Sequence, residues 1–257
     1  MTYFRDNIEK MEGYVPGFQP KGPEVVKLNT NENPYPPSPK VLEAIQNISA
    51  EQLRRYPEPL GDTFRRTAGD VFGLNSNCIM CTNGGDDLLT ICFRAFCDER
   101  RSAAYPSPTY SLYPVLAGLQ GCSVIEVAYS EDGYLDKLAE KDAALTIFCN
   151  PNAPTCTFEP IERLAELARK LKGILLVDEA YVDFSDDNCI RLIERHDNII
   201  ILRSMSKGYS LAGIRFGFCI AQSGIIEGLM KVKDSYNVDT VAPVSYTHLT
   251  LPTTPYE

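Results

Sequence analysis

The chain has 257 residues, of which 44% are hydrophobic and 23% charged, which is the composition of a globular protein with one large core, or a core plus a smaller lobe. Its net charge of −9 and its pI near 4.9 argue against a nucleic-acid partner, which would need a clustered basic face. No apolar stretch approaches the roughly 20 residues of a membrane span, and the start of the chain has no apolar signal-peptide region.

The first 45 residues are rich in Pro, Asn and Gly, and the segment PYPPSP (34–39) fits neither a central strand nor a helix interior. We interpret residues 1–45 as an extended arm belonging to a small domain, which leads into a helix around Lys40 to Asn47. The segment DDLLTICFRAF (86–96) predicts a further helix, buried because its body is nearly all apolar.

Four short apolar runs predict buried strands at 122–129, 144–150, 173–181 and 198–203. Between the second and third, the apolar residues of 160–171 share one helical face, with Pro160 suited to the first turn. This alternation predicts an α/β fold, with three layers and a mostly parallel sheet between helices. We expect one large domain over 46–244, and residues 245–257 read as an unrelated tail.

The nine cysteines are irregularly spaced and mostly lie in apolar runs, as reduced core residues of a cytosolic protein do. Cys78 and Cys81 have a spacing typical of zinc ligands, but no second pair follows and the chain has only two histidines. We therefore expect Cys78 and Cys81 to belong to a buried strand, with no metal site.

The strongest chemical signal is Lys207, in a polar loop just beyond the strand that ends near Arg203. Open α/β sheets bind ligands at the carboxyl ends of their strands. Partial burial and nearby Arg215 would lower the pKa of Lys207, which favours the neutral amine that attacks an aldehyde. Ser206 and Arg215 can both bind a phosphate group.

A second signal is Asp178, which follows four apolar residues at the end of a strand. A buried carboxylate there is costly unless it meets a cation, and a protonated pyridine nitrogen is one such cation. Tyr181, three residues further on, could reach a hydroxyl group of the same ring. Taken alone, Asp178 would better suit a role in capping the next loop.

Three loops complete the pattern. TNGGDD (82–87) places backbone amides around Gly85 and Asp86 at a helix N-terminus, which is a ready anion site. PSPTYSLY (106–113) holds Tyr110 in a proline-fixed loop, suited to stacking on a planar cofactor. NPNAPTCT (150–157) offers the amide of Asn152 in a rigid turn, although each of these loops could also be an ordinary turn.

In this order the segments resemble the fold-type I pyridoxal-phosphate aminotransferases, and among them most closely the histidinol-phosphate aminotransferases. The resemblance begins at LNTNENPYPPSP (28–39) and RYPEP (55–59) and fades near SYNVD (235–239), so that it covers about 210 residues. It implies a cytoplasmic homodimeric enzyme that transfers an amino group between L-histidinol phosphate and 2-oxoglutarate in histidine biosynthesis.

By position, the resemblance implies that Lys207 forms the Schiff base with pyridoxal phosphate, Asp178 binds the pyridine nitrogen and Tyr181 the ring oxygen. Tyr110 would stack on the ring. The resemblance further implies a phosphate cup formed by Gly85, Asp86, Ser206 and Arg215. Tyr56 would reach the phosphate across the subunit boundary, and Tyr35 would lie near the substrate.

Two departures from the family stand out. Where the family usually has Asn-Asn-Pro-Thr-Gly, this chain has Ala153 and Cys156 in place of the second Asn and the Gly, so the ring oxygen is bound by Asn152 in compensation or by Tyr181 alone. Family members also continue for roughly a hundred residues into a C-terminal small domain. We therefore expect a truncated chain of impaired activity.

Other readings remain open. A decarboxylase of amino-acid phosphates or an aromatic aminotransferase would share the cofactor residues. A non-catalytic remnant of the fold is a third possibility. Retention of Lys207, Asp178, Tyr181 and Arg215 argues against the remnant.

Overall fold

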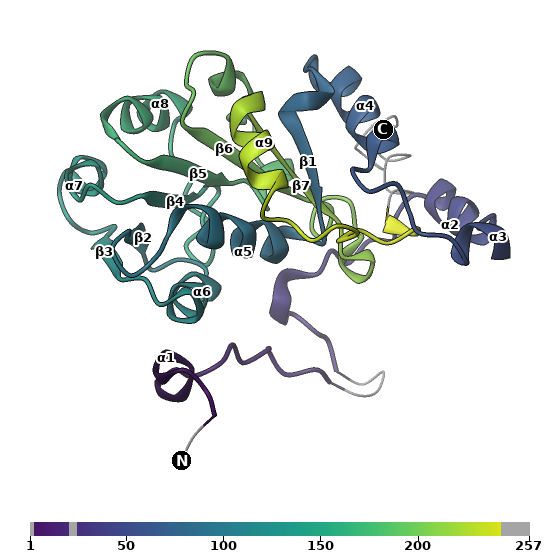
Figure 1. Cartoon of the computed structure of the whole chain (residues 1–257), viewed down its shortest axis with the longest axis horizontal. Helices are drawn as coiled ribbons and strands as arrows, with labels where there is room; N and C mark the ends of the chain where they lie inside the picture. The colour runs from purple at the N-terminus through teal and green to yellow at the C-terminus, as the bar shows by residue number, and fades with distance from the viewer. Residues whose placement is uncertain (1–2, 21–24, 243–257) are drawn as a thin grey trace.

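The computed structural model describes residues 3–20 and 25–242. At its centre is a seven-stranded sheet of order β1-β7-β6-β5-β4-β2-β3 (Figure 1). β7 runs antiparallel to its neighbours β1 and β6, and the other strand pairs are parallel. The strands are β1 (Ile79–Thr82), β2 (Ala103–Ser107), β3 (Val124–Ala128), β4 (Leu145–Cys149), β5 (Ile174–Asp178), β6 (Ile199–Ser204) and β7 (Gly217–Ala221).

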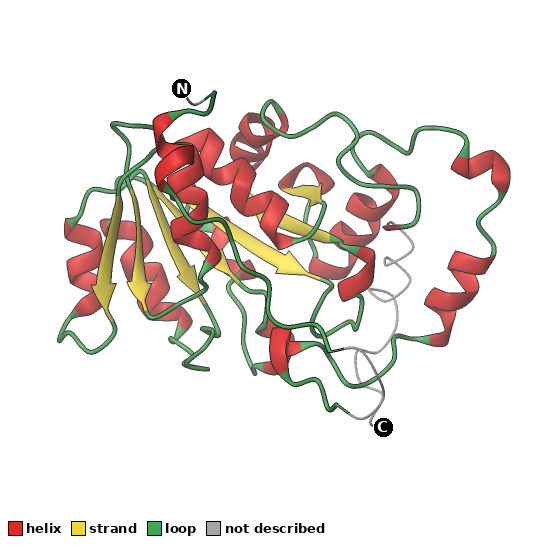
Figure 2. Ribbon diagram, turned by 90° about the horizontal axis from the view of Figure 1, so that it is seen from below, coloured by secondary structure: helices red, strands yellow, loops and turns green. Residues whose placement is uncertain are grey.

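Helices pack on both faces of this sheet, which gives the three layers expected from the sequence (Figures 1 and 2). The α-helices are α1 (Asp6–Lys10), α2 (Pro39–Gln46), α3 (Ala50–Leu53), α4 (Asp62–Phe72), α5 (Gly85–Phe96), α6 (Leu112–Gln120), α7 (Tyr134–Glu140), α8 (Ile161–Lys170) and α9 (Ser223–Met230). Short 3-10 turns are η1 (Asn29–Asn31), η2 (Ser76–Cys78), η3 (Val182–Phe184), η4 (Ile190–Glu194) and η5 (Ala212–Ile214).

The core is divided between the two faces because successive side chains of a strand point in opposite directions. Leu175 and Val177 of β5 belong to the cluster that packs against α4, α7 and α8. Leu176, between them, belongs to the cluster that packs against α5, α6 and α9. The continuous apolar runs of the central strands therefore reflect burial on both faces.

Most expected elements are confirmed. The helix predicted over 160–171 is α8, whose residues Ile161, Leu164 and Leu167 are buried, although Pro160 precedes the first turn as its N-cap. The helix predicted over 86–96 is α5, and the one around 40–47 is α2. Of the nine cysteines, all free, seven are buried, whereas Cys156 is exposed and Cys78 half-buried in η2.

Three sequence interpretations need correction. Cys78 was expected in a buried strand with Cys81, but it ends η2 and is half-buried, so that of the two only Cys81 lies in the strand β1. The strand predicted over 122–129 was expected to be buried, but β3 pairs only with β2 at the sheet edge, and Val127 alone of its residues is buried. β2 and β7 were not predicted. β2 contains Pro106, which the sheet tolerates because β4 pairs only with Ala103 and Ala104.

The N-terminal segment crosses the molecule before the sheet begins. α1 lies against α6, where Asn7 Nδ2 donates to the carbonyl of Gly118 at 2.8 Å. The chain then passes the carboxyl edge of the sheet and continues into α2 and α3, which project away from it (Figure 1). Within 3–20 and 25–242, no helix has the length and apolar character of a membrane span. The tail predicted at 245–257 lies outside the described residues.

Candidate active site

Lys207 lies in the loop that follows β6, at the carboxyl edge of the parallel strands. Its Nζ is 5.6 Å from the centroid of the Tyr181 ring and donates to the carbonyl of Thr30 at 2.5 Å. Burial lowers the pKa of Lys207 from the usual lysine value; Glu32 opposes this shift and Arg215 adds to it. The lysine is therefore closer to its nucleophilic, neutral form than a surface lysine is.

Asp178 is the last residue of β5, directly beside β6 in the sheet. Its side chain is buried, and its two oxygens accept hydrogen bonds from Tyr113 Oη (2.8 Å) and from the amide of Ala180 (3.1 Å). No side chain within 3–20 and 25–242 forms an ion pair with it, and burial raises its pKa. A buried carboxylate without a cation is suited to a ligand that brings one.

Tyr181 follows β5 by three residues and faces Lys207. Its hydroxyl accepts a hydrogen bond from Asn31 Nδ2 at 3.0 Å, so that a residue of the N-terminal arm reaches the site. Burial raises the pKa of the Tyr181 phenol, and the hydrogen bond from Asn31 acts in the opposite direction. A second arm residue, Asn33, donates to the Lys207 carbonyl at 3.0 Å.

The N-terminus of α5 forms a cup with the loop around Arg215. Gly84 precedes the helix at φ 81° and ψ 176°, a conformation that essentially only glycine adopts, and a Cβ there would lie 2.8 Å from Arg215 Nη2. Arg215 Nη1 also lies 3.4 Å from Ser206 Oγ, and its Nη2 lies 3.5 Å from Asp86 Oδ2. Helix amides, a hydroxyl and a guanidinium thus converge, which is a donor set for a phosphate.

Tyr110 lies beside this cup. Its hydroxyl donates to Asp86 Oδ1 at 3.3 Å, and its ring meets the Tyr113 ring edge-on, with centroids 5.6 Å apart. The structure therefore places Tyr110 beside the cup and, through Tyr113, next to the residue that bonds Asp178.

Asn152 is buried, and its side chain is fully engaged within the loops. Nδ2 donates to the Pro108 carbonyl at 3.0 Å and to Thr155 Oγ1 at 2.7 Å, and Oδ1 accepts from Thr109 at 2.8 Å. Both amide hydrogens are thus used. Cys156 adopts φ 57°, so cysteine takes the left-handed conformation that glycine would adopt more readily.

Two predicted residues lie outside this cluster. Tyr56 is 80% exposed and stacks on Tyr236 at 4.5 Å between centroids. Tyr35, in the arm, is half exposed, and its amide donates to Asn33 Oδ1 at 3.1 Å.

Sequence reasoning missed four residues that contact the site: Thr30, Asn31, Asn33 and Tyr113. The arm residues occur in LNTNENP, where polar side chains follow one another without periodicity, so that no local signal indicates their partners. Tyr113 follows Tyr110 by three residues, the spacing of one helical turn, and this spacing was the available signal.

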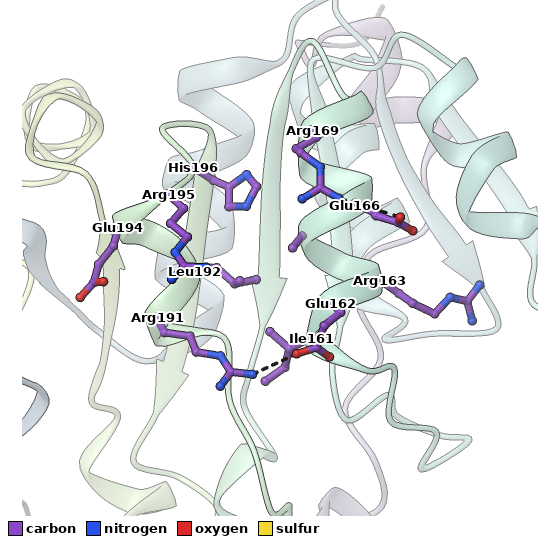
Figure 3. Close-up of a pocket in the computed structure, with 11 residues that line it drawn as sticks. Ile161, Glu162, Arg163, Glu166, Arg169, Arg191, Leu192, Glu194, Arg195 and His196 are labelled. Carbon is purple, nitrogen blue, oxygen red and sulfur yellow. Dashed lines mark hydrogen bonds and ion pairs between the residues drawn. The ribbon is translucent and has the colours of Figure 1, made fainter.

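A groove of about 650 Å³ lies elsewhere, between α8 and η4 (Figure 3). It contains none of the predicted site residues. Its arginines face glutamates, as in the pair Arg191–Glu162 at 3.2 Å, and these side chains are largely exposed. The groove is a solvated ionic surface, in which such pairs contribute little.

The donor set fits pyridoxal phosphate. The aldehyde can meet a lysine of lowered pKa, the pyridine nitrogen a buried carboxylate that lacks a cation, and the phosphate the cup at α5. A different cofactor would have to match the lysine, the buried carboxylate and the cup at the same time.

Comparison with known proteins agrees with this site. The model of the aminotransferases of class I and II matches residues 23–250, and the chain therefore belongs to that family. The cofactor of this family is pyridoxal 5'-phosphate. The homologous aminotransferases act on amino- and keto-acid substrates.

Several curated relatives are histidinol-phosphate aminotransferases. One from Trichormus variabilis is 47% identical over 94% of this chain and 70% of its own length. One from Rhodopirellula baltica is 42% identical over 93% of this chain and 67% of its own length. The crystal structure of the Sinorhizobium meliloti histidinol-phosphate aminotransferase with pyridoxal 5'-phosphate shares the fold, with a TM-score of 0.85 at 22% identity, over 97% of this chain and 71% of that one.

Proposed function

We propose that this chain transfers the amino group of L-histidinol phosphate to 2-oxoglutarate, giving imidazole acetol phosphate and L-glutamate in histidine biosynthesis. The observation that carries the proposal is the 47% identity to a histidinol-phosphate aminotransferase over 94% of the chain. The convergence of Lys207, Asp178 and Arg215 at one edge of the sheet supports it.

Bound pyridoxal phosphate supplies an aldehyde and a pyridine ring that accepts electrons. Lys207 would hold the aldehyde through its amine, since burial favours the neutral form of the lysine. Asp178 would keep the pyridine nitrogen protonated by offering it a charge partner in a buried setting. Tyr110 would offer its ring for stacking.

Tyr181 binds the ring oxygen without help from Asn152. Both side-chain amide hydrogens of Asn152 already bond within the loops, and Ala153 has no side-chain amide. Of the two possibilities left open by the sequence, the geometry supports Tyr181 acting alone from this side, with Asn31 as the hydrogen-bond partner of its hydroxyl.

The phosphate is held by Ser206, Arg215 and the backbone amides at Gly85 and Asp86. The carboxylate of Asp86 would repel a phosphate, but its ion pair with Arg215 and its hydrogen bond from Tyr110 keep it occupied. Only the amide of Asp86 contributes to binding in this proposal.

We further propose a homodimer in which Tyr56 reaches the phosphate of the partner subunit, and a substrate contact by Tyr35. The exposure of Tyr56 leaves its hydroxyl accessible to a second chain. Residues 1–45 form the arm and 46–244 the cofactor domain, a boundary that falls near the end of α2. Nine free cysteines favour the reducing cytosol.

The first experiment adds pyridoxal phosphate to the full chain, follows the absorbance of the lysine-bound cofactor, and fixes the bond with borohydride. We expect mass spectrometry to place the cofactor on Lys207, and Lys207→Ala to abolish the signal. Lys172→Ala is the control, since Lys172 lies just before the start of β5, at the opposite edge of the sheet from Lys207, and pairs with Asp142. Unchanged labelling in Lys207→Ala would refute the assignment.

The second experiment tests the substrate. The cofactor-loaded chain is mixed with L-histidinol phosphate, with an aromatic amino acid or with an amino-acid phosphate. We expect histidinol phosphate to convert the cofactor to its amine form faster than the aromatic amino acid or the amino-acid phosphate does. Faster conversion by the aromatic amino acid, or release of carbon dioxide from the amino-acid phosphate, would reject this substrate.

A further inference from the structure

The carboxylate of Asp178 depends on two hydrogen-bond donors. One is the backbone amide of Ala180, which no side-chain substitution removes. The other is the hydroxyl of Tyr113 on α6, which donates to Oδ2 at 2.8 Å. Tyr113 is fully buried, so that water cannot replace its hydroxyl without a change in packing.

The surroundings of Asp178 make this donor important. Burial favours the protonated carboxyl, and the charge of Asp86 on α5 acts in the same direction. The thiol of Cys149 on β4 faces the same hydroxyl but donates to the Pro151 carbonyl at 3.3 Å. Within the described residues, the hydroxyl of Tyr113 is therefore the one side-chain group that donates to Asp178. Burial keeps the pKa of Tyr113 well above its usual value, so that the hydroxyl remains protonated.

Tyr113 also fixes the orientation of Tyr110. The two rings meet at 88° with centroids 5.6 Å apart, an edge-on geometry that aromatic pairs favour. The ring of Tyr113 also packs against that of Tyr105, with centroids 5.6 Å apart. One side chain thus connects the carboxylate proposed to bind the pyridine nitrogen with the ring proposed to stack on the cofactor.

We propose that Tyr113 is a positioning residue for the transamination, whose hydroxyl keeps Asp178 ionised and oriented to bind a protonated pyridine nitrogen. This inference rests on the proposed function, because it assigns Tyr113 a role only if Asp178 binds that nitrogen.

The test compares two ligands in Tyr113→Phe, which removes the hydroxyl and keeps the ring. Pyridoxal phosphate should bind about tenfold more weakly, as expected for a lost hydrogen bond to a charged group. An analogue in which a C–H group replaces the ring nitrogen should bind as it does to the unmodified chain. Tyr105→Phe is the matched control, since that hydroxyl donates to Glu126 at 3.2 Å and does not touch Asp178; it should change neither affinity.

The pH dependence gives a second readout. Affinity for pyridoxal phosphate should fall as the pH falls through the pKa of Asp178, because the protonated carboxyl no longer attracts the pyridinium. Loss of the Tyr113 donor raises that pKa, so that the decline begins at a higher pH in Tyr113→Phe.

Equal weakening for both ligands would show that Tyr113 only supports packing, and no weakening for either would also overturn the proposal. An unmodified chain in which borohydride fixes no cofactor to Lys207 would instead refute the proposed function itself.

Discussion

The side-chain nitrogen of Asn31 lies 3.0 Å from the phenol oxygen of Tyr181, although the two residues are 150 positions apart in the sequence. This contact brings the N-terminal arm to the residue proposed to bind the ring oxygen. It places an amide group on Tyr181 in a chain where Ala153 offers none.

Asn31→Ala should weaken binding of pyridoxal phosphate by about threefold to tenfold, the effect of one neutral hydrogen bond. The variant also removes the group that lowers the pKa of Tyr181. A spectroscopic titration measures the affinity. Asn29→Ala is the control, because Asn29 bonds the Phe18 carbonyl and does not touch the site. Equal losses of affinity in the two variants would mean that the hydrogen bond from Asn31 to Tyr181 has no specific effect on binding.

Glu32→Gln should shift the reaction of Lys207 with the aldehyde to lower pH. Glu32 raises the pKa of Lys207 and pairs with Lys27 at 2.5 Å, so that its neutralisation removes an attraction and frees a second cation. The pKa of Lys207 then falls further and the neutral amine persists to lower pH. The midpoint of cofactor attachment against pH measures this. Glu140→Gln, on α7, should leave the midpoint in place, and an upward shift in Glu32→Gln would contradict the argument.

Gly84→Ala should impair phosphate binding at the cup. A Cβ there would meet Arg215 Nη2 at 2.8 Å, and the backbone conformation costs a non-glycine residue about 1–3 kcal/mol. Gly133→Ala is the matched control, since Gly133 also has a positive φ but no atom lies within 4 Å of its Cβ position. Both variants should lose stability on urea unfolding, and only Gly84→Ala should lose affinity for inorganic phosphate. Equal phosphate affinity in the two variants would show that the cup at α5 does not bind phosphate.

The buried ion pair between Arg203 Nε and Glu179 Oε2, at 2.7 Å, connects the segment after β5 with the end of β6. Glu179→Ala should lower the free energy of unfolding by about 3–5 kcal/mol, because it leaves a buried guanidinium without its close partner. Exposed Glu166→Ala should change it by less than about 1 kcal/mol, since its ion pair with Arg169 is on the surface. Urea denaturation measures both. Similar values for the two would show that solvent reaches Arg203.

The sequence by itself determined the layered α/β fold and indicated the residues that we propose for the cofactor chemistry. Apolar runs longer than two residues arise where both faces of a strand are buried, and a charged residue just after such a run lies at the edge where α/β sheets bind ligands. Lys207, Asp178 and the Gly84–Gly85 turn could thus be predicted from their local neighbours.

Only the tertiary structure decided which distant groups complete the site. Asn31 and Tyr113 reach Tyr181 and Asp178 through contacts that no local pattern records, because they depend on how the arm crosses the sheet edge and how α6 packs on it. The same holds for β3. Its apolar sequence suits a buried strand, but it pairs with β2 alone and forms the edge of the sheet. Its exposure depends on its place in the sheet, which the pairing of the other strands sets.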